Sequence, residues 1–227
     1  MLILGLIIGL VISSLWILIP YKRVKEDIKI EKKYYIRSIL TGMTLTTLAI
    51  MILEILWDAF MPVTPSSMNS MLEVVIVSFC RAALIEEAIK YLFVSKVLKK
   101  HKVNDPMQYM LLSGTIGMGY GIMEKLVSGS AFSLILNSFF ALHILFEFVM
   151  GDLLYKAEYE QGNRLKALLV PILLHGLWDT LLNGSTLLMN KEGIYLSIGA
   201  VIVIITCIIG IVYQIYMVRY LKKVSMK

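Results

Sequence analysis

The segment LIEEAIKYLF (residues 84–93) places two adjacent carboxylates, Glu86 and Glu87, and the ammonium of Lys90 inside a run that is otherwise apolar enough to cross a bilayer. A charged side chain inside a membrane helix costs about 2.5–3.5 kcal/mol on insertion scales, so it indicates a function by default. Glu86 and Lys90 are four residues apart and can pair on one helical face, whereas Glu87 points about 100° away. An ion pair therefore explains Glu86 and Lys90 and leaves Glu87 without a structural reason.

The rest of the chain predicts an all-α, polytopic transmembrane helical bundle. Hydrophobic residues make up 58% of the 227 residues, whereas soluble domains contain about 45–50%. With two cysteines, the chain has no disulfide framework and no CxxC metal site. We expect a single integral membrane domain over residues 1–227, with motif-bearing helices at about 70–189. The expected seven spans are about 2–20, 38–60, 70–94, 107–127, 131–155, 167–189 and 194–217.

The basic residues predict the orientation of these spans. Of the 22 Lys and Arg residues, 18 fall in the segments 21–37, 95–106, 156–166 and 218–227, and the opposite loops hold only Lys191. By the positive-inside rule we expect a multi-pass protein of the cell membrane with its N-terminus outside and its C-terminus in the cytoplasm. The net charge of +6 is accounted for by this topology, so the bilayer is an expected partner and nucleic acid is not.

Three other expected spans carry polar residues. Glu124 closes the glycine-rich stretch GTIGMGYGIMEKL (residues 114–126), whose glycines indicate either close helix packing or close approach of the backbone to another group. His143 precedes Glu147 by four residues, and His175 precedes Asp179 by four. Two intramembrane histidines, each with an acid one turn later, favour a shared polar site over isolated helix contacts.

A depth estimate tests whether these side chains can meet. Measured from the cytoplasmic ends of the expected spans, Glu86 and His175 lie about 12 Å deep, and His143 and Asp179 about 18 Å deep. These four can therefore share one level in the inner half of the membrane. Glu124 lies about 26 Å deep, so it joins them only if its span starts later, is tilted or is broken at its glycines.

Two kinds of chemistry suit such a cluster. A buried carboxylate can act as a general base toward water while a second acid or a histidine donates to the oxyanion. Alternatively, His143, His175 and Glu124 can hold zinc, whose bound water becomes the nucleophile. Both routes lead to hydrolysis, and zinc is the cofactor to consider, although HExxH is absent from the sequence.

The ordered motifs EEAIK (86–90), YGIME (120–124), HILFEFVMG (143–151) and HGLWD (175–179) resemble those of the PrsW family of intramembrane proteases. That family is related to the CAAX prenyl endopeptidases and the CPBP proteins. Its motifs are EExxK, FxxxE, a histidine followed eight residues later by glycine, and HxxxD. The resemblance covers about residues 70–185 and implies a polytopic protease, often labelled metallo-type, that cuts membrane-bound substrates. Namesake members cleave a membrane anti-sigma factor.

The resemblance also implies roles for the motif residues. Glu86 is expected to be the general base, and Glu87 to share a proton with it. The two histidines orient water, donate to the oxyanion or bind zinc, and Asp179 orients His175. The catalytic set is Glu86, Glu87, Glu124, His143, His175 and Asp179, with Lys90 supporting it.

The sequence therefore predicts an intramembrane endopeptidase acting on a membrane-anchored protein or peptide, anti-sigma-factor-like by family, with either a glutamate-only or a metal-dependent mechanism. One alternative is a proton- or ion-coupled transporter, which would favour an inverted repeat that the sequence does not show. Another is a non-catalytic scaffold or immunity protein of the same fold, in which the motif residues would tolerate alanine.

Overall fold

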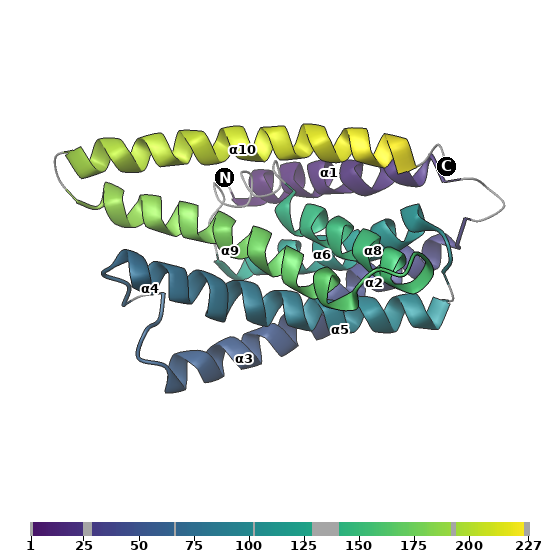
Figure 1. Cartoon of the computed structure of the whole chain (residues 1–227), viewed down its shortest axis with the longest axis horizontal. Helices are drawn as coiled ribbons and strands as arrows, with labels where there is room; N and C mark the ends of the chain where they lie inside the picture. Colours follow the sequence, from purple (N-terminus) through teal and green to yellow (C-terminus); the bar gives the residue numbers. More distant parts are fainter. Residues whose placement is uncertain are drawn as a thin grey trace.

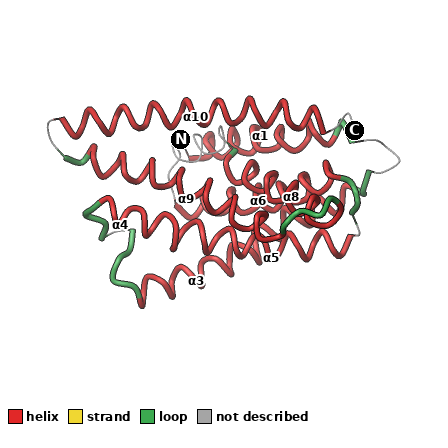
Figure 2. Tube along the Cα trace, viewed as in Figure 1, coloured by secondary structure: helices red, strands yellow, loops and turns green. Residues whose placement is uncertain are grey.

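The structure is a computed structural model that describes residues 2–24, 29–65, 67–101, 103–128, 141–191 and 194–224. Within these residues the chain forms helices joined by short connections, with no strand (Figures 1 and 2). The all-helical bundle expected from the sequence is thus confirmed. The helices are α1 (Leu2–Tyr21), α2 (Lys32–Thr41), η1 (Gly42–Thr46), α3 (Thr47–Phe60), α4 (Met71–Ile76), η2 (Val77–Ala83), α5 (Leu84–His101), α6 (Pro106–Ser128), α8 (Leu142–Tyr159), α9 (Arg164–Met189) and α10 (Ile194–Val224).

Two of the rods contain a π-helical segment. The segment η1 joins α2 to α3, and η2 joins α4 to α5, so residues 32–60 and 71–101 are each one uninterrupted rod. Counted this way, the described residues form seven rods, one for each expected span. Their ends differ from the expected ones: α5 continues beyond residue 94 to His101, and α8 continues beyond residue 155 to Tyr159. The expected start of the fifth span, at residue 131, lies outside the described residues.

The rod that carries the two adjacent glutamates begins at a capped end. Pro62 and Pro65 follow α3 and cannot continue a helix with normal backbone hydrogen bonds. The Ser70 hydroxyl then accepts a hydrogen bond from the backbone N–H of Glu73 at 3.3 Å, and the Glu73 carboxylate accepts one from the backbone N–H of Ser70 at 2.9 Å. This capping box satisfies two amide donors at the start of α4.

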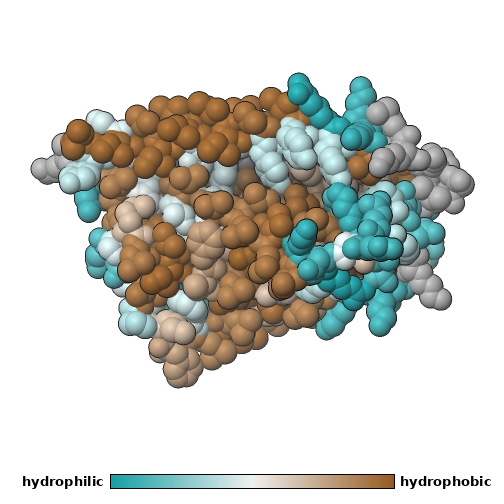
Figure 3. All heavy atoms as spheres, in the orientation of Figure 1, coloured by the Kyte–Doolittle hydropathy of each residue, from teal (hydrophilic) through white to brown (hydrophobic). Residues whose placement is uncertain are grey.

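The outer surface of the bundle is apolar over most of its length. Figure 3 shows hydrophobic side chains over α9 and α10, with hydrophilic ones gathered at the end that holds the C-terminus. Three rods, Lys32–Phe60, Arg164–Met189 and Ile194–Val224, are long and apolar enough to cross a membrane by length and composition, and Leu10–Tyr21 is a shorter apolar helix. An apolar surface of this extent requires a bilayer to cover it, so the chain is a membrane protein.

The helix α6 lies at the centre of the bundle, with α8, α2 and η1 packed on it. Its glycines allow this packing on two sides. A Cβ atom on Gly119 would lie 2.1 Å from the carbonyl oxygen of Ile39 in α2, and one on Gly117 would lie 2.4 Å from that of His143 in α8. Of the two interpretations of the glycine stretch, the structure shows close helix packing, and this packing brings α8 against α6 at His143.

Candidate active site

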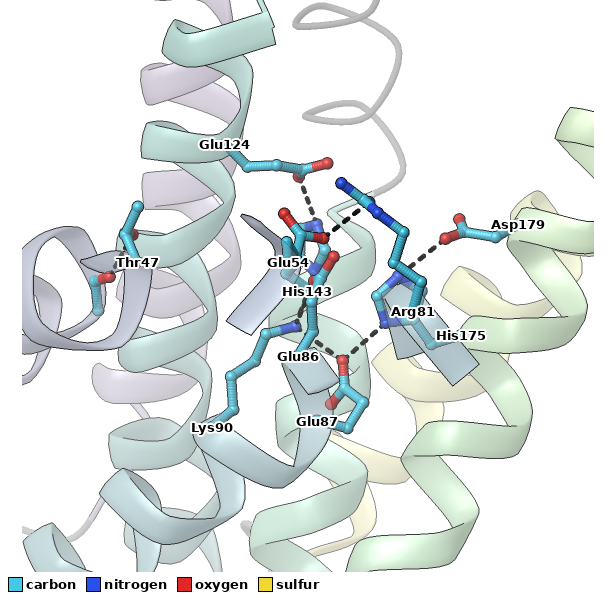
Figure 4. Close-up of polar contacts among 11 residues, drawn as sticks. Thr47, Glu54, Arg81, Glu86, Glu87, Lys90, Glu124, His143, His175 and Asp179 are labelled. Carbon is cyan, nitrogen blue, oxygen red and sulfur yellow. Dashed lines mark hydrogen bonds and ion pairs between the residues drawn. The ribbon is translucent and has the colours of Figure 1, made fainter. Parts of the chain in front are cut away.

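The polar side chains of four helices meet in the interior of the bundle (Figure 4). Helix α5, directly after η2, supplies Glu86, Glu87 and Lys90 from its first two turns. The last turns of α6 supply Glu124, and the first turn of α8 supplies His143. The middle of α9 supplies His175 and Asp179. All seven residues expected from the motifs therefore lie in one connected network.

Lys90 is the hub of this network and has no exposed surface. Its ammonium donates to Glu87 Oε1 at 2.7 Å and lies 3.2 Å from both Glu86 Oε2 and His143 Nδ1. On another side it lies 4.5 Å from the ring centroid of Tyr120. The sequence paired Lys90 with Glu86 and left Glu87 over; the structure corrects this, because the spacing of three residues also brings Glu87 onto the lysine's face.

The contacts of His143 fix its tautomer. An ammonium can only donate hydrogen bonds, so the Nδ1 atom of His143 accepts from Lys90. The proton of the neutral ring is then on Nε2, which donates to Glu124 Oε2 at 2.7 Å. Both nitrogens of His143 are therefore engaged, and its ring links α5 to the end of α6.

His175 lies between two carboxylates. Its Nδ1 atom is 2.8 Å from Glu87 Oε1, and its Nε2 atom is 3.3 Å from Asp179 Oδ2. The imidazole stacks on the ring of Phe146, with 5.3 Å between centroids. Since the Glu87 oxygen also accepts from Lys90, α5 and α9 are joined through one atom.

The contact between His143 and Glu124 corrects the depth estimate. Measured from the start of α6 at Pro106, Glu124 lies about 27 Å along its helix. Because α8 extends to Tyr159, His143 lies about 24 Å from that end rather than 18 Å. Glu86 similarly lies about 22 Å from the end of α5 at His101. The cluster is therefore farther from these helix ends than the sequence indicated, and Glu124 is level with it.

Two buried residues around the cluster, Glu147 and Tyr120, were not among the expected site residues. Glu147 is completely buried, and neither of its carboxylate oxygens has a hydrogen-bond donor within the described part of the chain. Its carboxyl group faces that of Glu87. Tyr120 is also buried, and its ring lies 4.5 Å from the Lys90 ammonium and 5.1 Å from the His143 ring, measured to the ring centroids. The sequence signal for Glu147 was its position four residues after His143. The signal for Tyr120 was its place in the motif YGIME.

A separate ion-pair cluster joins α3 to η2. The guanidinium of Arg81 donates to Asp58 Oδ1 at 2.8 Å, to Asp58 Oδ2 at 3.0 Å and to Glu54 Oε1 at 3.0 Å. Glu54 and Asp58 are four residues apart on one face of α3, and their partner comes from the turn that precedes Glu86. These contacts fix the start of α5 against α3.

A small cavity opens beside the cluster. Its volume is about 50 Å³, and its polar lining consists of Glu124, His143, His175 and Asp179. A cavity needs about 10–15 Å³ to hold one water molecule, which also requires polar partners. The space therefore suits a few water molecules next to the two histidines, as a hydrolytic reaction needs.

The donor set for a metal ion can be tested directly. Among the described residues, Glu86, Glu87, His143 and His175 each offer one ligand atom, and these atoms lie within 4.8 Å of one another. Histidine and carboxylate ligands suit zinc. Glu124, expected as a ligand, is outside this group and instead accepts the hydrogen bond from His143.

The arrangement of these donors nevertheless does not fit a metal ion. The ammonium of Lys90 lies within 3.2 Å of three of the four, and a divalent cation about 4 Å from it would be repelled by roughly 8 kcal/mol at an effective dielectric constant of 20. In addition, both nitrogens of His143 already have partners outside the candidate group, Lys90 and Glu124, whereas a ligating imidazole needs a free lone pair.

Comparisons with known proteins add independent findings. A family model described as "PrsW family intramembrane metalloprotease" matches residues 31–209. A curated relative, "Protease PrsW" from Clostridioides difficile (strain 630), is 30% identical over 127 residues, which are 48% of this chain and 53% of the relative. The chain thus spans about half the length of the curated relative that it matches. No solved structure matches the chain.

Proposed function

The chain belongs to the PrsW family of intramembrane metalloproteases, as its four motifs predicted, and on that premise we propose that it is an endopeptidase that hydrolyses a peptide bond of a membrane-anchored protein. The observation that carries the proposal is the buried network of Glu86, Glu87, His143 and His175 beside a cavity of about 50 Å³. Carboxylates, imidazoles and space for water are the components of a glutamate-based hydrolytic site.

Glu86 is the general base. Glu87 Oε1 already accepts hydrogen bonds from Lys90 and faces His175, so that carboxylate is committed to holding its neighbours. Glu86 has fewer contacts that hold it: its Oε2 atom lies 3.2 Å from the Lys90 ammonium but makes no aligned hydrogen bond within the residues described. It takes a proton from water, and the water oxygen attacks the carbonyl carbon of the scissile bond.

His175 stabilises the oxyanion that forms in this step. Its ring borders the cavity, and its Nε2 contact with Asp179 is 3.3 Å, longer than the 2.8 Å contact of Nδ1 with Glu87. The Nε2–H group is therefore the donor that a substrate oxygen can capture: Asp179 orients it before the substrate binds, and Glu87 holds the ring through Nδ1 during the step. When the carbon–nitrogen bond breaks, Glu86 returns the proton to the leaving amine.

The substrate class follows from the surroundings of the site. The network lies inside a bundle whose outer surface is apolar, so a substrate reaches it from the bilayer, as a membrane-anchored protein or peptide does. An anti-sigma-factor-like protein is the family-level candidate. In this proposal residues 1–227 act as one integral membrane domain, with the N-terminus outside and the C-terminus in the cytoplasm.

The proposal is tested with the full chain purified in detergent and offered single-pass membrane proteins. Glu86→Gln and His175→Asn are each expected to slow cleavage by about 10²–10⁴-fold without lowering the amount of protein in the membrane. Lys96→Gln, an exposed change on the same rod, is the control. Cleavage by Glu86→Gln at the wild-type rate would reject the proposal in favour of a transporter or a non-catalytic scaffold.

A further inference from the structure

Three of the four candidate ligands of the cluster contact a cation that the chain itself provides. We propose that the ammonium of Lys90 takes the place of a divalent metal ion in this protein, so that the peptide bond is hydrolysed without a bound metal. The inference rests on the proposed function and departs from the metalloprotease description of the family. Lys90 has no exposed surface and contacts Glu86, Glu87 and His143, so it is a positioning residue that holds the base and its neighbours.

The geometry around the ammonium supports this replacement. A lysine ammonium has three N–H donors, and three acceptors from the candidate metal group lie around it. They are Glu87 Oε1 at 2.7 Å, Glu86 Oε2 at 3.2 Å and His143 Nδ1 at 3.2 Å (Figure 4). Glu87 Oε1 and His143 Nδ1 accept hydrogen bonds from the ammonium, and Glu86 Oε2 contacts it as an ion pair, so the ammonium joins two carboxylates and an imidazole as a bound metal ion would.

The position of Lys90 is also enclosed. The side chain has no exposed surface, and the Tyr120 ring centroid lies 4.5 Å from Nζ, which adds a cation–π contact. A metal ion entering the group would have to displace a buried charge from three oppositely polarised partners and a ring. The ammonium therefore belongs to the resting arrangement of the site.

The two histidines agree with a site built around an ammonium. His143 accepts from Lys90 and donates to Glu124, and His175 lies between Glu87 and Asp179. His143 therefore has no nitrogen left for a metal, and both rings have contacts that orient a hydrogen-bond donor.

The first experiment measures metal in the wild-type protein. The full chain is purified in detergent without chelators, and its zinc, iron, manganese and cobalt contents are determined by mass spectrometry. We expect far less than one equivalent of any of them, and cleavage that is unchanged by EDTA or 1,10-phenanthroline. One equivalent of bound metal, whose removal abolishes cleavage and whose return restores it, would overturn the inference.

The second experiment asks whether Lys90 is what keeps a metal out. Lys90→Met removes the ammonium and frees the three ligand atoms that it contacts, with little change in the bulk of the side chain. This variant is therefore expected to bind Zn²⁺ at least about tenfold more tightly than the wild type. A rise in thermal midpoint with added Zn²⁺ reports the binding. The rise should be lost in Lys90→Met/His143→Ala and absent in Lys96→Met, which changes an exposed lysine of the same helix. Equal affinity in the wild type would contradict the inference.

These measurements separate the two proposals. If the wild type cleaves no candidate substrate, the proposed function fails, and the metal content and the Zn²⁺ titrations still decide the role of Lys90. If the wild type cleaves but contains an essential metal, only the present inference fails. Should Lys90→Met not accumulate in the membrane, the metal content of the wild-type protein decides the inference alone.

Discussion

Removal of the buried charge on Lys90 should have a large effect on stability. Lys90 is completely buried and contacts Glu86 and Glu87, which are themselves buried. Removing one partner of a buried ion pair typically costs about 3–5 kcal/mol, because the remaining charge is left without compensation. For a chain of this length, each kcal/mol lowers the thermal midpoint by about 2–4 °C. We therefore expect Lys90→Met to lower the midpoint by about 6–20 °C in metal-free buffer.

The assay is thermal unfolding in a mild detergent, followed by the fluorescence of the native tryptophans. Lys96→Met is the matched control, because Lys96 is exposed on the same helix, and its midpoint should stay within about 2 °C of the wild type. Adding Glu87→Gln to Lys90→Met removes one uncompensated carboxylate and should recover part of the loss. A Lys90→Met protein that unfolds within about 2 °C of the wild type would refute the reasoning that the ammonium balances the two carboxylates.

Three further outcomes are expected. Gly117→Ala should lower the thermal midpoint and slow cleavage, since its Cβ would lie 2.4 Å from a backbone oxygen of α8; Gly184→Ala, whose Cβ would meet only the flexible end of a methionine at 2.8 Å, should change neither. Glu147→Gln should keep stability and cleavage, because its amide can donate to the facing carboxylate, whereas Glu147→Leu should reduce both. Burial and the nearby cations Lys100 and Arg37 lower the pKa of His101 from 6.5, so its contribution to stability is present above pH 6.5 and is lost as the pH falls through the lowered value. Midpoints of the wild type and His101→Gln between pH 5 and 8 should therefore converge at low pH, and parallel curves would contradict this assignment.

Hydropathy predicted the helical rods well because each is a long apolar run bounded by polar residues. It did not predict where α5 and α8 end, since both continue into the basic segments beyond the apolar runs. That extension of α8 changed the depth of His143 and removed the mismatch with Glu124. Hydropathy also gave no sign of η1 and η2, because a π-helical turn has the same composition as an α-helical one.

The motifs predicted which residues form the network, but sequence spacing could not predict which of them are in contact. Helical spacing allowed Lys90 to reach both glutamates, and the position of His175 on another helix selects Glu87 as their shared partner. Burial of Glu147 depends on the close packing of α6 against α8, which is a property of two helices together. Contacts between rods are set by three-dimensional packing, which one sequence does not contain.

The π-helical segment Val77–Ala83 directly precedes the two adjacent glutamates. A π-helical turn holds more residues than an α-helical turn, so the angular position of everything after it depends on the number of residues in the segment. If the segment became α-helical with the same number of residues, Glu86, Glu87 and Lys90 would rotate together around the rod by about 100°, the angle of one residue. The direction of the carboxylates therefore depends on the extra residue of the π-helical turn, and a change that made this turn α-helical without removing a residue would turn all three side chains away from the histidines.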